Sequence, residues 1–124
     1  MNTLKISSQR IIVPFECPAT SIDLGQAQAN DQVLFWTQSG CYGFLITDAG
    51  RRQGQLIRQG GQPCEATWLG TLAAADGESS LEVATIKTGA RAMFQISSEG
   101  RSRRMLTSVI TKIVIIRQTA FFLT

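Results

Sequence analysis

One long run of β-branched residues near the C-terminus limits the fold more than any other feature of this chain. From Thr107 to Ile116, every residue except Ser108 and Lys112 is branched at Cβ. Such branching restricts χ1 against a helical turn and suits a pleated surface, so this run predicts a strand. Its last four residues, 113–116, are all apolar and therefore occupy both faces. A strand that is apolar on both faces is covered on both sides.

Turn signals recur about every ten residues between Ser39 and Gly100, with short apolar or alternating segments between them. This rhythm is typical of an antiparallel meander in a sandwich or a barrel. We therefore expect an all-β fold: a small antiparallel barrel or sandwich of about seven to nine strands, with at most one short helix. The length predicts a single domain over residues 1–124, with an apolar C-terminal tail at 119–124.

Residues 66–74 are the one segment whose pattern is ambiguous. Trp68, Leu69 and Leu72 stand among three alanines, which would suit a short helix. However, Asp76-Gly77 follows directly, and Asp-Gly between two apolar runs is a strong hairpin signal. We therefore expect this segment to form a strand hairpin with residues 80–86.

The composition is that of a globular protein, with 44% hydrophobic and 17% charged residues. No apolar stretch approaches about 18 residues, so we expect no membrane-spanning helix, and the N-terminal residues do not resemble a signal peptide. The spacing of Cys17, Cys41 and Cys64 matches no zinc motif. We expect three reduced, mostly buried thiols in a cytoplasmic protein; the alternative is one disulfide and one free thiol.

The residue types argue against catalysis. The chain has no histidine, which excludes Ser-His-Asp and Cys-His mechanisms and histidine-ligated metals. No phosphate-binding glycine motif is present, and the acidic residues lie in turn-like, polar settings where they are expected to be solvated. Cys41 lacks a histidine to lower its pKa, so a structural thiol is favoured. We expect no metal, no cofactor and no enzyme activity; an enzyme that uses carboxylates or Cys41 remains the third alternative.

The positive charge is concentrated toward the C-terminus. Residues 1–50 carry two basic and four acidic side chains, whereas residues 87–124 carry seven basic side chains and one acidic. Small β-barrels bind nucleic acid with basic loops and exposed aromatic residues. The candidate residues for nucleic acid or another polyanion are the basic loop Arg101, Arg103 and Arg104, the turn pair Arg51 and Arg52, and the stacking residues Tyr42, Trp36 and Trp68. The alternative is a solvated loop that protects an apolar strand from aggregation.

The C-terminal segment has more apolar residues than one small domain can readily hide. The candidates for self-association are Val114, Ile116, Phe121 and Phe122. Either the tail folds back over its own domain, or another subunit covers it. We therefore expect a non-catalytic binding or assembly module that forms a homo-oligomer through its C-terminal strand. The alternative is a small β-barrel that binds nucleic acid through the basic loop.

Overall fold

The computed structural model describes residues 10–73 and 81–122, and it confirms the all-β prediction. That part of the chain contains ten strands and a single 3-10 turn at Leu24–Gln26, and no α-helix. The strands are β1 (Arg10–Ala19), β2 (Ser21–Asp23), β3 (Gln32–Thr37), β4 (Gly40–Asp48), β5 (Gln53–Arg58), β6 (Cys64–Ala73), β7 (Leu81–Val83), β8 (Thr85–Lys87), β9 (Ala90–Ser98) and β10 (Arg101–Phe122).

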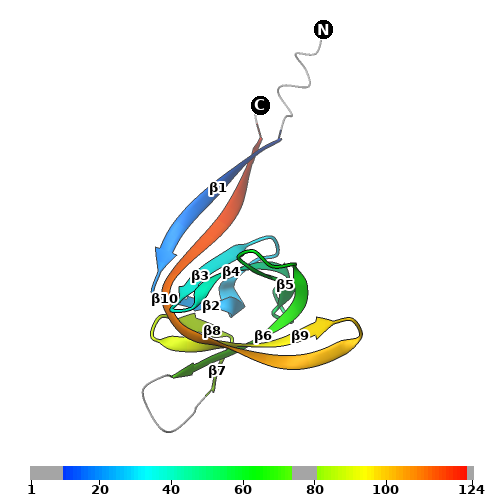
Figure 1. The fold of residues 1–124 in the computed structure, drawn as a ribbon. Coiled ribbons are helices and arrows are strands. Elements are labelled where there is room, and N and C mark those ends of the chain that lie inside the picture. Colours follow the sequence, from blue (N-terminus) through cyan, green and yellow to red (C-terminus); the bar gives the residue numbers. More distant parts are fainter. Residues whose placement is uncertain (1–9, 74–80, 123–124) are drawn as a thin grey trace.

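Six of these strands close into an antiparallel barrel, which decides between the two predicted architectures (Figure 1). The order around the barrel is β3, β4, β5, β6, β9 and β10, and β10 returns to β3. Closure depends on β10, which is 22 residues long and pairs first with β9 and then with β3. Its register shifts between Leu106 and Val109 and again between Ile110 and Lys112. Such irregularities bend a strand and let one strand serve both sides of a closed sheet.

The inside of the barrel is filled by aromatic side chains. Phe35, Phe44, Trp68 and Phe94 are fully buried, and each contacts at least two of the others. Their ring centroids lie 4.6–6.1 Å apart, which is the usual range for favourable aromatic pairs. The interior of this barrel is therefore a packed core, as expected for a barrel of few strands.

The segment at residues 66–74 forms a strand, as predicted, as far as the structure describes it. It belongs to β6, and Leu72 pairs with Leu81 of β7. The Asp76-Gly77 turn lies outside the described residues. The main partners of β6 are β5 and β9, so this hairpin is a minor extension of the barrel wall.

The cysteines are free thiols, but the expectation that most are buried is wrong. Cys17 is exposed, and Cys41 and Cys64 are partly exposed. Cys17 belongs to an edge strand and Cys41 to the outer face of the barrel wall, where strand alternation directs side chains away from the core.

Of the C-terminal tail expected at residues 119–124, the structure describes residues 119–122, and these do not form a separate segment; residues 123–124 lie outside the described residues. Residues 119–122 continue β10 and pair with β1, in a ladder that runs from Ala19 opposite Ile113 to Arg10 opposite Phe122. The alternative in which the tail folds back over its own domain is therefore wrong. Local sequence patterns could not predict that β10 pairs with β1, because the two paired segments are about a hundred residues apart in the sequence.

Candidate functional site

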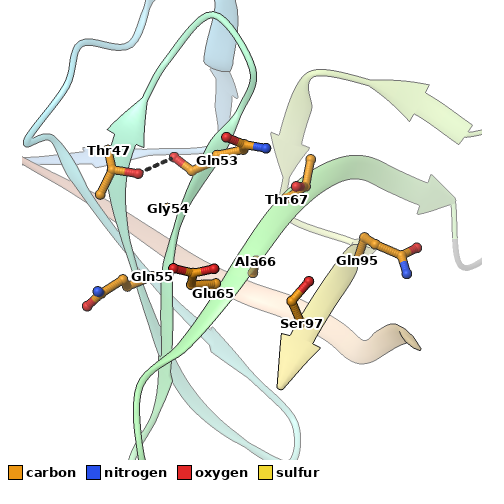
Figure 2. Close-up of a pocket in the computed structure, with 9 residues that line it drawn as sticks. All are labelled: Thr47, Gln53, Gly54, Gln55, Glu65, Ala66, Thr67, Gln95 and Ser97. Carbon is orange, nitrogen blue, oxygen red and sulfur yellow. Dashed lines mark hydrogen bonds between the residues drawn. The ribbon is translucent and has the colours of Figure 1, made fainter. Parts of the chain in front are cut away.

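A polar groove crosses the outer surface of four neighbouring barrel strands, β4, β5, β6 and β9 (Figure 2). The small residues Gly54 and Ala66 contribute to its lining, and hydrogen-bonding side chains surround them. We call this surface the polar groove; its lining residues are Thr47, Gln53, Gly54, Gln55, Glu65, Ala66, Thr67, Gln95 and Ser97. Most of these residues alternate along their strands with buried ones, which explains why their polar side chains share the outer face.

The chemistry of the polar groove is that of neutral hydrogen bonding. Amides and hydroxyls dominate, and Glu65 is the one charged residue among the lining residues that the structure describes. The Thr47 hydroxyl already donates to the backbone oxygen of Gln53 at 3.3 Å. Amides, hydroxyls and one carboxylate can together donate and accept hydrogen bonds to a polar ligand.

The three arginines expected in a basic loop lie instead at the start of β10. The preceding Glu99-Gly100 turn has positive φ at both residues, 54° and 76°. Two consecutive positive φ values make the tight turn that matches the twist of a hairpin. Strand pairing therefore resumes at once, with Arg101 opposite Ser98. The prediction of a loop is wrong, although the side chains are exposed as expected: Arg101, Arg103 and Arg104.

Strand geometry separates these arginines onto two faces. Arg104 lies opposite Gln95, which lines the polar groove, so Arg104 borders that groove. Arg103 lies opposite the buried Ile96 and is therefore on the other face, together with Arg101. The structure thus brings one arginine, and not all three, to the polar groove.

The other two arginine candidates lie within the turn between β4 and β5. Arg51 is exposed and reaches Asp48, with its Nε 3.9 Å from the carboxylate. Arg52 has a structural contact instead, because its Nε donates to the Trp68 backbone oxygen at 3.1 Å. The Trp68 amide donates back to the Arg52 oxygen at 2.9 Å. Arg52 therefore joins β6 to the turn, and its guanidinium is only partly free for a ligand.

The proposed aromatic stacking residues are not arranged for that role. Tyr42 and Trp68 are buried in the barrel core, so the prediction that they face a ligand is wrong. Both occupy inward positions of their strands, because the alternation of β4 and β6 places them opposite the solvent face. Trp36 lies on the outer face, where Lys112 is positioned over its ring at 4.8 Å from the centroid. This contact stabilises the outer wall through a cation–π interaction.

The self-association candidates lie along the C-terminal half of β10. Ile113 points into the core and Val114 to the outside, but Val114 is only 9% exposed. Its neighbours across the sheet are Leu34 of β3 and Pro18 of β1, and β-sheet neighbours shield one another in this way. The expectation that Val114 is left uncovered by its own chain is therefore wrong, whereas Ile116 is partly exposed.

Beyond Ile116, β10 leaves the barrel. Its pairing with β3 ends where Ile116 faces Gln32, and from Arg117 onward β1 is its one partner among the described strands. Figure 1 shows this two-stranded ribbon projecting away from the barrel. We call it the arm; it comprises residues 10–15 and 117–122, and it includes the backbone of Phe121 and Phe122.

An ion pair between the buried Asp31 and the partly exposed Arg117 lies at the base of the arm, and no sequence pattern predicted it. Asp31 was expected to be a solvated turn residue, yet it is only 2% exposed, so that expectation is wrong. Arg117 donates to it from Nε at 3.1 and 3.2 Å and from Nη2 at 2.8 Å. The backbone N–H of Gln28 donates to the same carboxylate at 2.9 Å. This hydrogen bonding raises the pKa of Arg117 above its ordinary value. The pair fixes the strand at the point where the arm begins.

The chain matches no known protein family, no curated protein and no solved structure. Within residues 10–73 and 81–122, no helix has the length and apolar character needed to cross a membrane. The same part of the chain contains no cluster of three or more histidine, cysteine or acidic residues that could hold a metal ion.

Proposed function

We propose that this protein is a non-catalytic assembly module that self-associates through the arm. The observation that supports the proposal is the arm itself, a two-stranded ribbon that leaves the barrel (Figure 1). Its sequence includes Ile11-Ile12-Val13 on one strand and Phe121-Phe122 on the other. A two-stranded ribbon has no core of its own and is at best marginally stable in water. A second subunit would supply the surface that the arm lacks.

The size of the apolar segment makes association energetically favourable. Each large apolar side chain removed from water contributes roughly 1.5–3 kcal/mol. The arm carries at least five such residues in its sequence. Burying five such side chains would contribute roughly 7.5–15 kcal/mol before the costs of association. The binding free energy of a micromolar complex is about 8 kcal/mol.

The edge of β1 favours association through the faces of the arm over extension of the sheet. β1 is the terminal strand of its sheet in the described residues, and it contains Pro14 and Pro18. Proline has no amide donor, so an edge strand that carries two prolines is a poor template for a further strand. Contact through the faces of the ribbon avoids this restriction.

The solution mass of the protein tests this proposal. Sedimentation velocity on the full chain, at concentrations from low to high micromolar, is expected to show a species heavier than the monomer. The double substitution Phe121→Ser/Phe122→Ser should weaken association at least about tenfold, because it replaces two large apolar side chains. A matched control is Leu106→Ser, which changes an exposed apolar residue on the barrel at the far end of β10.

Two results would contradict the proposal. One is a full-length protein that sediments as a monomer at high micromolar concentration. The other is an oligomer that loses as much mass with Leu106→Ser as with the arm substitutions. Circular dichroism of each variant verifies that the β fold is retained.

The second candidate function is nucleic-acid binding at the polar groove, and the position of Arg104 favours it. Arg104, Gln95 and Thr67 are paired residues on three successive strands, so a phosphate-binding side chain stands next to hydrogen-bonding ones. Arg101 and Arg103 are exposed close by on the same strand. Buried Tyr42 and Trp68 leave this surface without the stacking platform that single-strand binders use, which makes it the weaker candidate.

Salt dependence distinguishes this second candidate from the first. Neutralising the three β10 arginines to glutamine should weaken binding to mixed DNA and RNA oligonucleotides for every sequence. It should also flatten the dependence of affinity on salt by about one logarithmic unit per lost phosphate contact. Arg58→Gln serves as the matched control, since Arg58 is exposed on β5, away from β10. Absence of binding by the unmodified protein at low salt ends this candidate.

A further inference from the structure

An apolar row crosses the outer face of the barrel in register from one strand to the next. Pro18 of β1 pairs with Val114 of β10, Val114 with Leu34 of β3, Leu34 with Gly43 of β4, and Gly43 with Ile57 of β5. We call these five residues the apolar row. Val114, Leu34, Gly43 and Ile57 each have at least one strand neighbour that is buried in the core, so the row faces outward.

Gly43 makes the row hollow at its centre. A Cβ atom at this position would lie 3.4 Å from the nearest Leu34 methyl carbon, so the missing side chain leaves an open depression beside Leu34. Leu45 and Cys41 flank Gly43 on the same strand, and Ile57 forms the opposite side with 39% of its surface exposed. This depression is apolar, in contrast to the polar groove, which lies further along β4 and β5, where Gln55 of the groove pairs with Leu45.

The row cannot be covered by the arm of its own chain. Pro18 and Val114 belong to the same β1–β10 ladder that continues into the arm, and the arm projects away from the barrel (Figure 1). Folding back onto the row would break the ladder at its base, where Arg117 is held by Asp31. An arm that reaches the row therefore has to come from another copy.

The dimensions of the arm and the row agree. Six residues of extended strand, Arg117–Phe122, span about 20 Å at roughly 3.3 Å per residue. The row covers the four spacings between β1 and β5, which is roughly 19 Å at about 4.8 Å per spacing. A ribbon that crosses the underlying strands at a steep angle is an established way for two sheets to pack.

We infer that the apolar row is the docking site for the arm of a second copy, with the depression at Gly43 receiving apolar side chains of that arm. The two contacts would then be related by a two-fold axis, each arm lying on the other barrel, as in the commonest type of homodimer. This inference rests on the proposed function, which requires the arm to associate but does not say with what surface. It also explains why the row begins on the strands that carry the arm.

A cross-linking experiment tests the inference, because Cys41 lines the depression. The variant carries Thr119→Cys in the arm, together with Cys17→Ser and Cys64→Ser to remove the other thiols. Mild oxidation should give a disulfide-linked dimer, and peptide mass analysis should find position 41 of one copy joined to position 119 of another. The control adds Cys41→Ser, which should abolish this particular link.

Filling the depression gives a second, independent measurement. Gly43→Val is compatible with the backbone, because φ is not positive there and the nearest atom is a flexible Leu34 methyl group. It should leave the circular dichroism and melting temperature close to those of the unmodified protein and weaken association by at least about tenfold. Thr47→Val, in the polar groove, is the control and should leave association unchanged.

The outcomes separate the inference from the proposed function. A cross-link between positions 41 and 119, lost association with Gly43→Val, or both, would support the docking site. An oligomer that is indifferent to Gly43→Val and forms no such link would overturn the docking site while self-association stands. Disulfide links between position 41 of two copies would mean that the apolar rows of the two copies contact each other, which also overturns the docking of the arm on the row. A monomeric full-length protein would overturn both.

Discussion

Replacing Arg117 with methionine should destabilise the barrel measurably, because it leaves the buried Asp31 carboxylate without its charged partner. Three contacts join the Arg117 guanidinium to Asp31, the shortest at 2.8 Å. Methionine keeps the aliphatic stem and removes the charge. The Asp31 carboxylate, 2% exposed, would retain the Gln28 amide as a hydrogen-bond donor.

The magnitude follows from the exposure of the two partners. Removing one member of a fully buried ion pair costs about 3–5 kcal/mol. Here the Arg117 side chain is 42% exposed, so water can reach the vacated position and the loss is smaller. We expect the free energy of unfolding to fall by about 2 kcal/mol, a roughly thirtyfold change in the folded-to-unfolded ratio. For a domain of this size, that corresponds to about 8 °C in melting temperature.

A double-mutant cycle with Arg117→Met and Asp31→Asn measures the interaction itself. Urea unfolding of the two single variants and the double variant should give a coupling energy above about 1 kcal/mol. The matched control is Arg51→Met: its pair with Asp48 has a 3.9 Å separation and side chains 77% and 49% exposed, so the loss should stay below about 0.5 kcal/mol. If Arg117→Met costs no more than Arg51→Met, the reasoning is refuted.

The pH dependence of this effect has a definite sign on the arginine side. The hydrogen bond to Asp31 raises the folded-state pKa of Arg117. A group whose pKa is raised on folding contributes its stabilisation fully below its unfolded pKa and loses it only as pH rises through the folded value. The unfolded pKa of an arginine already lies far above pH 9, so the contribution of the guanidinium should not change between about pH 7 and 9.

Two further predictions concern the barrel wall and the core. Gly70→Ala should lower the free energy of unfolding by at least about 2 kcal/mol, since φ is +146° and the new Cβ would lie 2.3 Å from the Glu82 backbone oxygen. Gly89 also has a positive φ, but no atom lies within 4 Å of the new Cβ, so Gly89→Ala should lower it by only about 1 kcal/mol. Equal losses of stability for the two variants in thermal unfolding would contradict the close approach between Gly70 and the Glu82 backbone. Phe94→Ala should lower the free energy of unfolding, measured with urea, by about 3–5 kcal/mol. Leu106 is exposed, so Leu106→Ala should lower it by less than about 0.5 kcal/mol. A loss below about 2 kcal/mol for Phe94→Ala would contradict a closely packed interior.

The strand content could be predicted from sequence because it depends on local patterns. β-branched residues and alternation predicted the long final strand, and regular turn signals predicted the meander. Closure of the barrel could not be predicted in this way. It depends on β10 pairing with β9, β3 and β1 in succession, and two irregularities in its register allow this. Such pairings join residues up to about a hundred positions apart, which no local pattern encodes.

The candidate sites were predicted less well, since they depend on which face each side chain occupies. Alternation in β4 and β6 places Tyr42 and Trp68 in the core, although aromatic content alone made them candidates for an exposed surface. The turn at Glu99-Gly100 places the arginines in a strand and divides them between two faces. Asp31 and Arg117 are 86 residues apart, and an acidic residue at a turn gave no reason to expect burial.

The prediction that the strand at residues 113–116 has apolar side chains on both faces is correct, but the inference that its outer face needs a second subunit was too broad. Its apolar faces do lie on both sides of a sheet, with Ile113 inside and Val114 outside. However, Val114 stands in the middle of the sheet, where Leu34 and Pro18 on the adjacent strands shield it. A central strand position thus needs little help from a second subunit. Among the described residues, such neighbours are missing at β10 beyond Ile116, which has β1 alone beside it, and at Gly43, which has no side chain; the proposed association would use these two places. In the proposed dimer, a second copy would cover both the ribbon, which has no further strand beside it among the described residues, and the hollow at Gly43.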